Sequence, residues 1–378
     1  MKRIREMFVN RGQAIEPELA SSADAHLEQK DKRVFLEHSL TIFTDEYKHE
    51  LEEILDGVDF DVLRSLVLES CGRSGFNPEN VNFLNKDRVL LICGNRFSDY
   101  GDKSLDNPRD EGIRTVPLDT LGEYSYKANL VHIYATNIDF FKRSKESGGL
   151  VKEDMRDKLE MPNMKLLILD TLVRAEIKAS SKQECRLTVE GNHYFVEQLK
   201  AGYEQPDVSG NVLYKLFNEA VAEKRAQELT QKYLKRETDF TDKADVEKLY
   251  QMWNRLGDRK VLVSLVNMMI EKLSDTVGLP QETVWQAFVR GQEEGEELGN
   301  FADLFAEIFS RDFLFRLAHC DNNDEALKLI DEMAISEGAV RKWLDLNKAF
   351  LNTDHAGDYL ADVFPLYKDK PPKTKGSA

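Results

Sequence analysis

Apolar residues recur at helical spacing over most of this chain. Between residues 34 and 55 they fall at steps of three and four, which places them on one face of a helix, and a second such segment spans residues 61–71. The same spacing returns at residue 208 and continues to residue 364. In that part we predict helices over residues 209–236, 243–256, 258–277, 281–297, 298–318, 322–335 and 337–351. The pattern therefore predicts a mainly α-helical protein.

An aromatic stripe runs along the predicted helix 298–318 and consists of Phe301, Phe305, Phe309 and Phe313. Aromatic residues four positions apart lie on one side of a helix, and such a side usually packs in a core. We therefore predict that the stripe is buried. An exposed docking stripe is the alternative.

Residues 80–135 follow a different pattern. Residues 88–94 form a short apolar, β-branched run between turn-forming residues, which predicts a buried strand. Residues 129–134 predict either a second strand or the start of a helix. The first 32 residues hold no apolar face for more than a turn, so we expect a poorly ordered arm or a loosely docked helix there.

A long polar loop, residues 94–117, lies between the two predicted strands. It mixes carboxylates and guanidinium groups after the end of a strand, and loops of this kind can host phosphate or metal chemistry. The candidate site residues in it are Asn95, Arg96, Asp99, Asp102, Arg109 and Arg114. No glycine-rich phosphate-binding motif accompanies them, so a solvated connector with ion pairs is the simpler interpretation.

The clearest motif lies in residues 148–200. A predicted helix over 151–160 is followed by the turn Met161–Pro162 and a longer helix over 163–175. An extended stretch begins at Ile177, turns over 180–183 and returns over 185–188. The segment Leu187-Thr188-Val189-Glu190-Gly191 then opens a last helix, which reaches Leu199.

This order of helix, turn, helix, hairpin and helix resembles the winged helix-turn-helix superfamily over residues 135–200. Glu176 stands where many such domains have Gly. The resemblance implies that the second helix of the motif is a contact surface. Its outward positions would include Leu166, Leu167 and Asp170, a poor match to phosphates and base edges, so we predict that they contact protein.

DNA contact through the same module is the alternative prediction. Nine basic and nine acidic residues lie between residues 148 and 200, so the module has no net charge to attract DNA. A thin basic face could nevertheless touch phosphates. The residues that would form it are Lys142, Arg143, Lys145, Lys178 and Lys182.

These observations predict a mainly α fold with N-terminal helices, a small α/β segment with a winged helix-turn-helix, and a C-terminal acidic all-α domain. The predicted divisions are a flexible arm over 1–32, a helical and short-strand segment over 33–135, the winged helix over 136–204, the acidic helical domain over 205–366 and a disordered tail over 367–378.

Charge limits the classes of partner. The chain contains 52 Lys and Arg residues and 68 Asp and Glu residues, so its formal net charge is −16. Such a surface repels phosphates and argues against a protein that binds nucleic acid over its whole surface. Residues 206–365 hold 30 acidic and 19 basic residues, and Gln292–Glu297 is the densest acidic patch. We predict a solvated helix face for this patch, with a docking surface for a basic partner as the alternative.

The four cysteines, Cys71, Cys93, Cys185 and Cys320, are far apart in the sequence. This spacing predicts buried free thiols in a reducing compartment. The longest apolar run, residues 261–270, is about half of the ~20 residues that a membrane span needs, and no signal-peptide pattern is present at the N-terminus. We therefore expect a cytoplasmic protein that does not contact membranes.

Catalytic motifs are weak. Asp170 and the segment Glu176-Ile177-Lys178 match the motif of a carboxylate followed by Glu-x-Lys that Mg²⁺-dependent nucleases use. Asp170 lies in a segment with helical spacing, however, so solvated charges are the simpler interpretation. The seven histidines have no metal-ligand spacing, and we expect no cofactor.

We therefore predict a non-enzymatic regulatory or interaction protein that uses the winged helix and the acidic helical domain as binding surfaces. Its partner would be another protein or a second copy of the chain. The alternatives are a DNA-binding transcriptional or replication regulator and a Mg²⁺-dependent nuclease or other enzyme centred on the loop 94–117.

Overall fold

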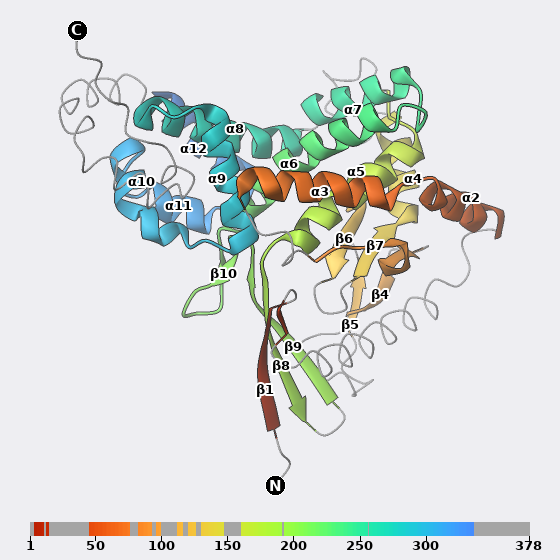
Figure 1. Ribbon diagram of the computed structural model, residues 1–378, viewed down its shortest axis with the longest axis horizontal. Helices are drawn as coiled ribbons and strands as arrows, with labels where there is room; N and C mark the ends of the chain where they lie inside the picture. Colours follow the sequence, from red (N-terminus) through yellow and green to blue (C-terminus); the bar gives the residue numbers. More distant parts are fainter. Residues whose placement is uncertain are drawn as a thin grey trace. The chain divides into compact units, whose positions relative to one another are not determined.

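The computed structural model describes residues 4–10, 13–14, 45–75, 82–92, 96–99, 112–115, 120–125, 130–146, 160–190, 193–255 and 257–335 (Figure 1). The chain forms two compact units, neither of which is continuous in sequence. Unit 1 comprises residues 1–68, 79–201 and 225–256, and unit 2 comprises residues 69–78, 202–224 and 257–378. The contiguous divisions predicted from the sequence do not coincide with these units.

Unit 1 combines helices with small sheets. Its strands are β1 Ile4–Asn10, β2 Gln13–Ala14, β3 Val89–Ile92, β4 Arg96–Asp99, β5 Gly112–Thr115, β6 Gly122–Ser125, β7 Leu130–Tyr134, β8 Gln183–Glu190 and β9 His193–Ala201. Its helices are α2 Asp45–Asp56, most of α3 Phe60–Ser74, the short 3₁₀ helix η2 Lys86–Arg88, α4 Ala135–Glu146, α5 Met164–Ser180, the second part of α6 Lys215–Arg236, and α7 Lys243–Arg255.

Unit 2 is helical in its described part, apart from one short hairpin. The hairpin consists of β10 Gln205–Pro206 and β11 Val212–Leu213. The helices are the end of α3, the first part of α6, α8 Gly257–Val277, α9 Gln281–Glu294, the 3₁₀ helix η4 Leu298–Phe301, α10 Ala302–Ile308, α11 Phe313–His319 and α12 Asn323–Ile335.

A three-stranded sheet with the order β3–β7–β6 lies at the centre of unit 1. β3 and β7 are parallel, with Val89 opposite Val131, and β6 runs antiparallel to β7. Every residue of β7 is buried, as expected for an apolar central strand. Helix α5 packs on this sheet (Figure 1). Gly122 of β6 lies so close to Thr171 of α5 that an added Cβ would come within 2.5 Å of the Thr171 Cγ2.

The strands predicted from apolar runs are confirmed at 89–92 and 130–134. The prediction of an irregular loop over 94–117 is wrong at its two ends, where β4 and β5 form an antiparallel pair. The first 32 residues are also not simply an arm, because β1 pairs with β8 along its whole length, from Ile4 opposite Glu190 to Asn10 opposite Glu184. This partner is distant in sequence, so local periodicity could not identify it.

Two elements of the predicted winged helix are wrong. Ile177 does not begin a strand, because α5 continues to Ser180, and residues 193–201 form the strand β9 instead of a helix. β8 and β9 form a long hairpin that, with β1 and β2, makes a four-stranded antiparallel sheet. The first predicted helix, 151–160, lies almost wholly outside the described residues.

The acidic helical segment follows the predicted pattern over α6, α7, α8, α9 and α12. The predicted helix 298–318 is wrong as a single element, because it divides into η4, α10 and α11. The aromatic stripe is nevertheless packed together: the rings of Phe309 and Phe313 lie 4.3 Å apart between their centroids, and Phe305 and Phe313 are buried. Both belong to the hydrophobic core of unit 2, which α8, α9, α10, α11 and α12 share. The predicted helix 337–351 and the tail 367–378 lie outside the described residues.

No helix among the described residues is long and apolar enough to cross a membrane. Cys71 and Cys320 are buried free thiols, as predicted, and burial raises the pKa of the Cys320 thiol to about 11. The side chains of Cys93 and Cys185 lie outside the described set.

Candidate protein-docking surface

The predicted protein-contact residues on α5 lie inside unit 1. Leu166, Leu167 and Asp170 are completely buried. The reason is that α5 is covered on several sides, by β6 and β7, by α4 and by α7. Asp170 accepts a hydrogen bond from the Trp253 indole N–H at 3.2 Å and pairs with Arg174 at 3.1 Å.

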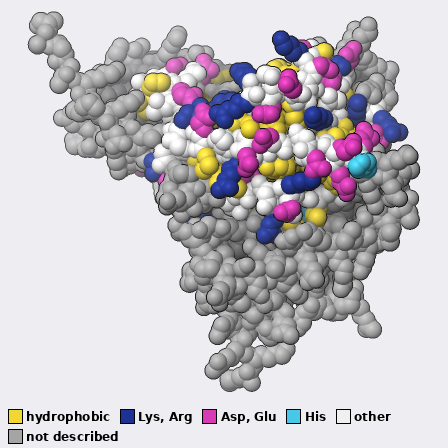
Figure 2. All heavy atoms as spheres, turned by 45° about the vertical axis from the view of Figure 1, so that its right-hand side comes forward, with side chains coloured by type: hydrophobic (Ala, Val, Ile, Leu, Met, Phe, Trp, Pro, Cys, Tyr) yellow, Lys and Arg dark blue, Asp and Glu magenta, His cyan; other side chains and the backbone are white. Residues whose placement is uncertain are grey.

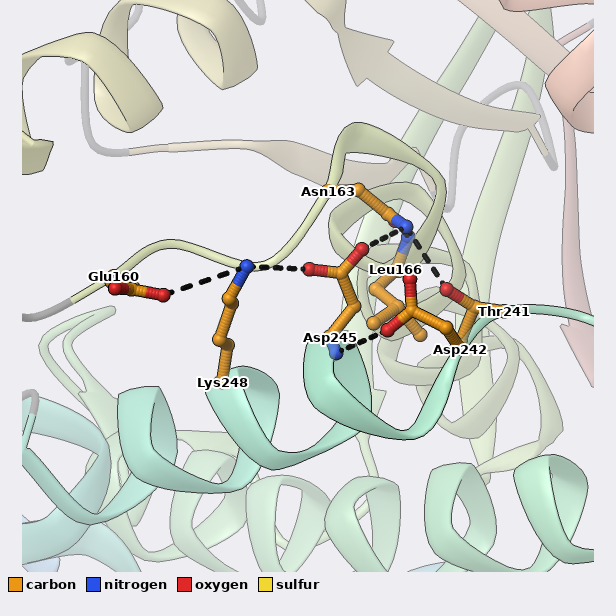
Figure 3. A network of polar contacts seen from close by, with 7 residues as sticks. All are labelled: Glu160, Asn163, Leu166, Thr241, Asp242, Asp245 and Lys248. Carbon is orange, nitrogen blue, oxygen red and sulfur yellow. Dashed lines mark hydrogen bonds and ion pairs between the residues drawn. The ribbon is translucent and has the colours of Figure 1, made fainter.

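A polar network joins the N-termini of α5 and α7 (Figure 3). The Asn163 side-chain oxygen accepts from the Leu166 N–H at 2.9 Å and caps α5, while its amide donates to Thr241 Oγ1 at 2.9 Å and to Asp245 Oδ2 at 2.7 Å. Lys248 adds an ion pair to Asp245 at 3.0 Å. The network fixes α7 against α5 and has a structural role.

The nuclease-like string is also placed inside a helix. Asp170, Glu176 and Lys178 all lie on α5, whereas the chemistry requires carboxylates on neighbouring strands. Glu176 is buried, and its two carboxyl oxygens accept from the Leu84 N–H at 3.3 and 3.2 Å. Burial raises the pKa of Glu176 from 4.5 to about 8, although the Leu84 N–H and the charges of Arg64 and Arg225 act in the opposite direction.

The candidate DNA-contact residues lie on α4 and at or just beyond the end of α5, and two of them form ion pairs with carboxylates. Arg143 pairs with Asp139 at 2.7 Å, and Lys182 pairs with Glu184 at 3.3 Å. Lys142 and Lys178 are half-buried, and the side chain of Lys145 lies outside the described set. On the face drawn in Figure 2, basic and acidic side chains are interspersed, with hydrophobic side chains between them.

Half of the predicted loop-site residues lie beyond the described residues. Asn95, Asp102 and Arg109 are outside them. Arg96, Asp99 and Arg114 lie on β4 and β5, whose backbones pair Arg96 with Thr115 and Phe97 with Arg114, but the directions of their side chains are not described. No group of three or more His, Cys, Asp or Glu side chains among the described residues could hold a metal ion.

The acidic patch 292–297 is not fully solvated. Glu293 is buried, and its two oxygens accept from the Cys71 thiol and the Ser74 hydroxyl, each at 2.9 Å. Gln292 is buried as well, and its amide donates to the backbone and side-chain oxygens of Asn218. The prediction of a solvated face is therefore wrong for the first two residues of the patch, which fix α9 to α3 and α6.

The exposed large hydrophobic side chains of the described residues all belong to unit 2. Among the described residues, the large hydrophobic side chains that are exposed are Val208, Val212, Phe315 and Leu327. Val208 and Val212 belong to the β10–β11 hairpin, and Phe315 belongs to α11. Val208 is as exposed as in an extended peptide, at 108 %, and Phe315 is 66 % exposed.

The turn that carries Val208 is held by hydrogen bonds. Asp207 Oδ1 accepts from the N–H groups of Ser209 at 2.7 Å and Asn211 at 2.8 Å, and Oδ2 accepts from the Asn211 side chain at 3.0 Å. These hydrogen bonds lower the pKa of the Asp207 carboxyl, and the bond from the Asn211 side chain makes the largest contribution. Gly210, at φ +84°, supplies the left-handed residue of the turn. The turn therefore holds Val208 in one place in solvent.

The base of the hairpin is anchored to the core of unit 2. Gly202 has φ +57°, and an added Cβ would come within 2.4 Å of Asn218 Oδ1. Asn218 also accepts from the Tyr203 N–H at 3.2 Å and donates to Glu204 at 3.0 Å. The Tyr203 hydroxyl donates to the Phe288 carbonyl at 2.9 Å. These contacts anchor the start of the hairpin to the core of unit 2.

Tyr214, which directly follows the hairpin, connects it to α11 by a backbone hydrogen bond. This residue has φ +59°, which is strained for a residue other than glycine, and its N–H donates to the Ala318 carbonyl at 2.8 Å. Phe315 lies three residues before Ala318, on the neighbouring part of the helix surface. The Phe315 ring contacts the His319 ring at a centroid distance of 4.2 Å. We call Val208, Val212 and Phe315 the unit 2 apolar surface.

No family model, curated protein or solved structure matches this chain. The winged-helix resemblance of residues 135–200 therefore stays a prediction.

Sequence reasoning missed the hairpin because it placed the start of a helix at residue 209. The signal was present in Pro206 and Gly210, with Asp207, Ser209 and Asn211 around them, since residues of these types favour turns.

Proposed function

We propose that this chain is a non-enzymatic interaction protein that docks a partner through the unit 2 apolar surface. The observation that carries the proposal is the placement of Val208 in full solvent on a turn held by three hydrogen bonds to Asp207. A single exposed apolar residue is ordinary, but here two lie on one short hairpin and an exposed aromatic lies on the helix bonded to its base.

Rigid presentation favours binding. A side chain that is already fixed in its bound position loses little conformational freedom on association. Full burial of a Val or Phe side chain contributes about 1.5–3 kcal/mol, so three such side chains make a useful anchor. Aromatic residues are frequent among the energetically dominant positions of interfaces, which suits Phe315.

The test compares native masses. The wild-type chain and the double variant Val208→Ser, Phe315→Ser are purified at low salt from the natural source cells, and each mass is measured by size exclusion with light scattering. We expect the wild type to elute in a complex larger than its own 43.4 kDa and the double variant to elute at that mass.

Leu327→Ser is the matched control. Leu327 is also exposed in unit 2. Glu332 marks the side of α12 that faces α11, because it pairs with Arg316 of α11. Leu327 lies five residues before Glu332, about 140° around the helix, and is therefore on a different side of α12. The control is expected to keep the complex. A wild type at 43.4 kDa, or a double variant that keeps the complex, would contradict the proposal.

A further inference from the structure

The strand β9, His193–Ala201, forms one edge of the four-stranded sheet of unit 1 (Figure 1). Among the described strands it pairs only with β8, so the other side of its backbone has no partner strand there. At an edge of this kind, alternate N–H and C=O groups point away from the sheet. They can bond to a further extended chain, which then continues the sheet.

The first part of β9 lacks the features that usually prevent such pairing. Residues 193–198 pair without interruption with residues 185–190 of β8, and the bulge in this ladder comes only after Gln198. The six-residue stretch contains no proline and no glycine, and Glu197 is its one residue among Asp, Glu, Lys and Arg. Residues 193–198 therefore offer a continuous edge to another strand.

The order of residues along this edge is complementary to itself. Successive residues of a strand belong to opposite faces of the sheet, so Tyr194 and Val196 share one face, and His193, Phe195 and Glu197 share the other. When two such strands run antiparallel with Phe195 opposite its own copy, His193 of each is opposite Glu197 of the other. Tyr194 is then opposite Val196.

These pairs are of the kinds that stabilise antiparallel strands. Pairs of two aromatic residues, pairs of an aromatic with a β-branched residue, and pairs of opposite charge are all favourable, and a histidine that takes up a proton beside a carboxylate supplies the last kind. Because the register places every residue from 193 to 197 in such a pair, the sequence of β9 fits a second copy of β9.

Other symmetric registers fit less well. A two-fold axis perpendicular to the sheet requires one residue to lie opposite its own copy. A centre at Val196 places Phe195 opposite Glu197, and a centre at Glu197 brings two carboxylates together. A centre at Tyr194 leaves only residues 193–195 within both strands. Phe195 is therefore the favoured centre.

We propose that the outer edge of β9 pairs with β9 of a second copy of this chain, antiparallel and with Phe195 at the two-fold axis. The contact belongs to unit 1, whereas the docking surface of the proposed function belongs to unit 2, so the two stand independently. Few residues take part, as in weak and transient interfaces, so we expect a Kd of about 10 µM and monomers at lower concentrations.

The test uses two charge variants of the full chain, Phe195→Lys and Phe195→Glu. Each variant alone places two like charges opposite each other at the centre of the contact, whereas an equimolar mixture places a lysine opposite a glutamate. Leu199→Lys is the matched control, because it adds the same charge to β9 beyond the paired residues. Sedimentation equilibrium gives the mass of each sample from about 1 to about 100 µM, a range that brackets the expected Kd.

The wild type and Leu199→Lys are expected to pass from 43.4 kDa to twice that mass over this range. Each charge variant alone should raise the Kd about tenfold or more, and the mixture should return it to within about threefold of the wild-type value. Recovery in the mixture also shows that both variants are folded, since misfolded chains would not regain a specific contact.

A wild type that stays monomeric at the highest concentration would refute the inference. So would charge variants that dimerise like the wild type, a mixture that stays monomeric, or a Leu199→Lys protein that is monomeric with an unchanged melting temperature. Masses above that of a dimer would show that different strands pair in an open chain, which also refutes the two-fold contact. None of these results bears on the proposed function, which Val208→Ser with Phe315→Ser tests separately.

Discussion

At the scale of the residue, three carboxylates buried in the described part of the chain have structural partners. Asp170 accepts a hydrogen bond from Trp253 and forms an ion pair with Arg174. Glu293 accepts hydrogen bonds from Cys71 and Ser74, and Glu176 accepts from the Leu84 N–H. Of these, Glu176 has the largest consequence for stability, because burial raises its pKa to about 8. The residue stays protonated in the folded protein at a pH at which it ionises in the unfolded chain.

Stability is therefore expected to fall as pH rises from 4.5 to about 8, because over this window the folded state holds a proton that the unfolded state has released. Glu176→Gln removes this titration and keeps an oxygen for the Leu84 N–H. Its advantage over the wild type should grow by up to about 1.4 kcal/mol per pH unit within the window. Urea unfolding at several pH values measures it.

The control for this prediction is Glu52→Gln, which changes an exposed carboxylate on α2. It should follow the wild-type pH profile. Parallel profiles for the wild type and Glu176→Gln would show that the buried carboxyl does not couple to folding.

At the scale of the element, the hairpin depends on two glycines in different surroundings. Gly202 and Gly210 both have positive φ, but an added Cβ at Gly202 would strike Asn218, while a Cβ at Gly210 would meet nothing within 4 Å. The same substitution therefore separates backbone strain from steric collision.

Gly210→Ala should cost about 1 kcal/mol, because only the left-handed backbone is penalised. Gly202→Ala should cost more, about 2–4 kcal/mol, since strain and displacement of Asn218 add to the backbone penalty. Urea denaturation of both variants measures the difference. Equal losses of stability would mean that the Asn218 side chain moves away from the added methyl group at no cost in free energy.

A second prediction at this scale concerns the network between α5 and α7. Asn163→Ala removes a helix cap and two further hydrogen bonds, so unfolding should become easier by about 1–3 kcal/mol. Lys248→Ala removes only more exposed ion pairs and should destabilise the protein less than Asn163→Ala does. Thermal and urea unfolding compare the two, and a greater loss for Lys248→Ala would be inconsistent with this description.

Elements with strong local periodicity were predictable, and those that depend on distant partners were not. The apolar runs at 89–92 and 130–134 predicted β3 and β7, and helical spacing predicted α3, α7, α8 and α12. The strand β9 was predicted as a helix because its apolar residues allow both readings, and only pairing with β8 decides between them.

At the scale of the whole molecule, the chain passes between two units through the long helices α3 and α6, whose residues are divided between them. A sequence carries no mark at such a division, because the helical pattern continues across it. This is why contiguous domains were predicted. The acidic character of the C-terminal half was predictable from composition, whereas the docking surface required the exposure of individual side chains in unit 2.

Site-specific photo-crosslinking tests the docking claim most directly. A benzophenone amino acid replaces Val208 in one protein and Leu327 in another, and both are irradiated in the cells that produce the chain. We predict a covalent adduct from position 208 that disappears when Phe315→Ser is added, and none from position 327. Adducts of equal yield at both positions, no adduct at 208, or an adduct that Phe315→Ser leaves unchanged would contradict the claim.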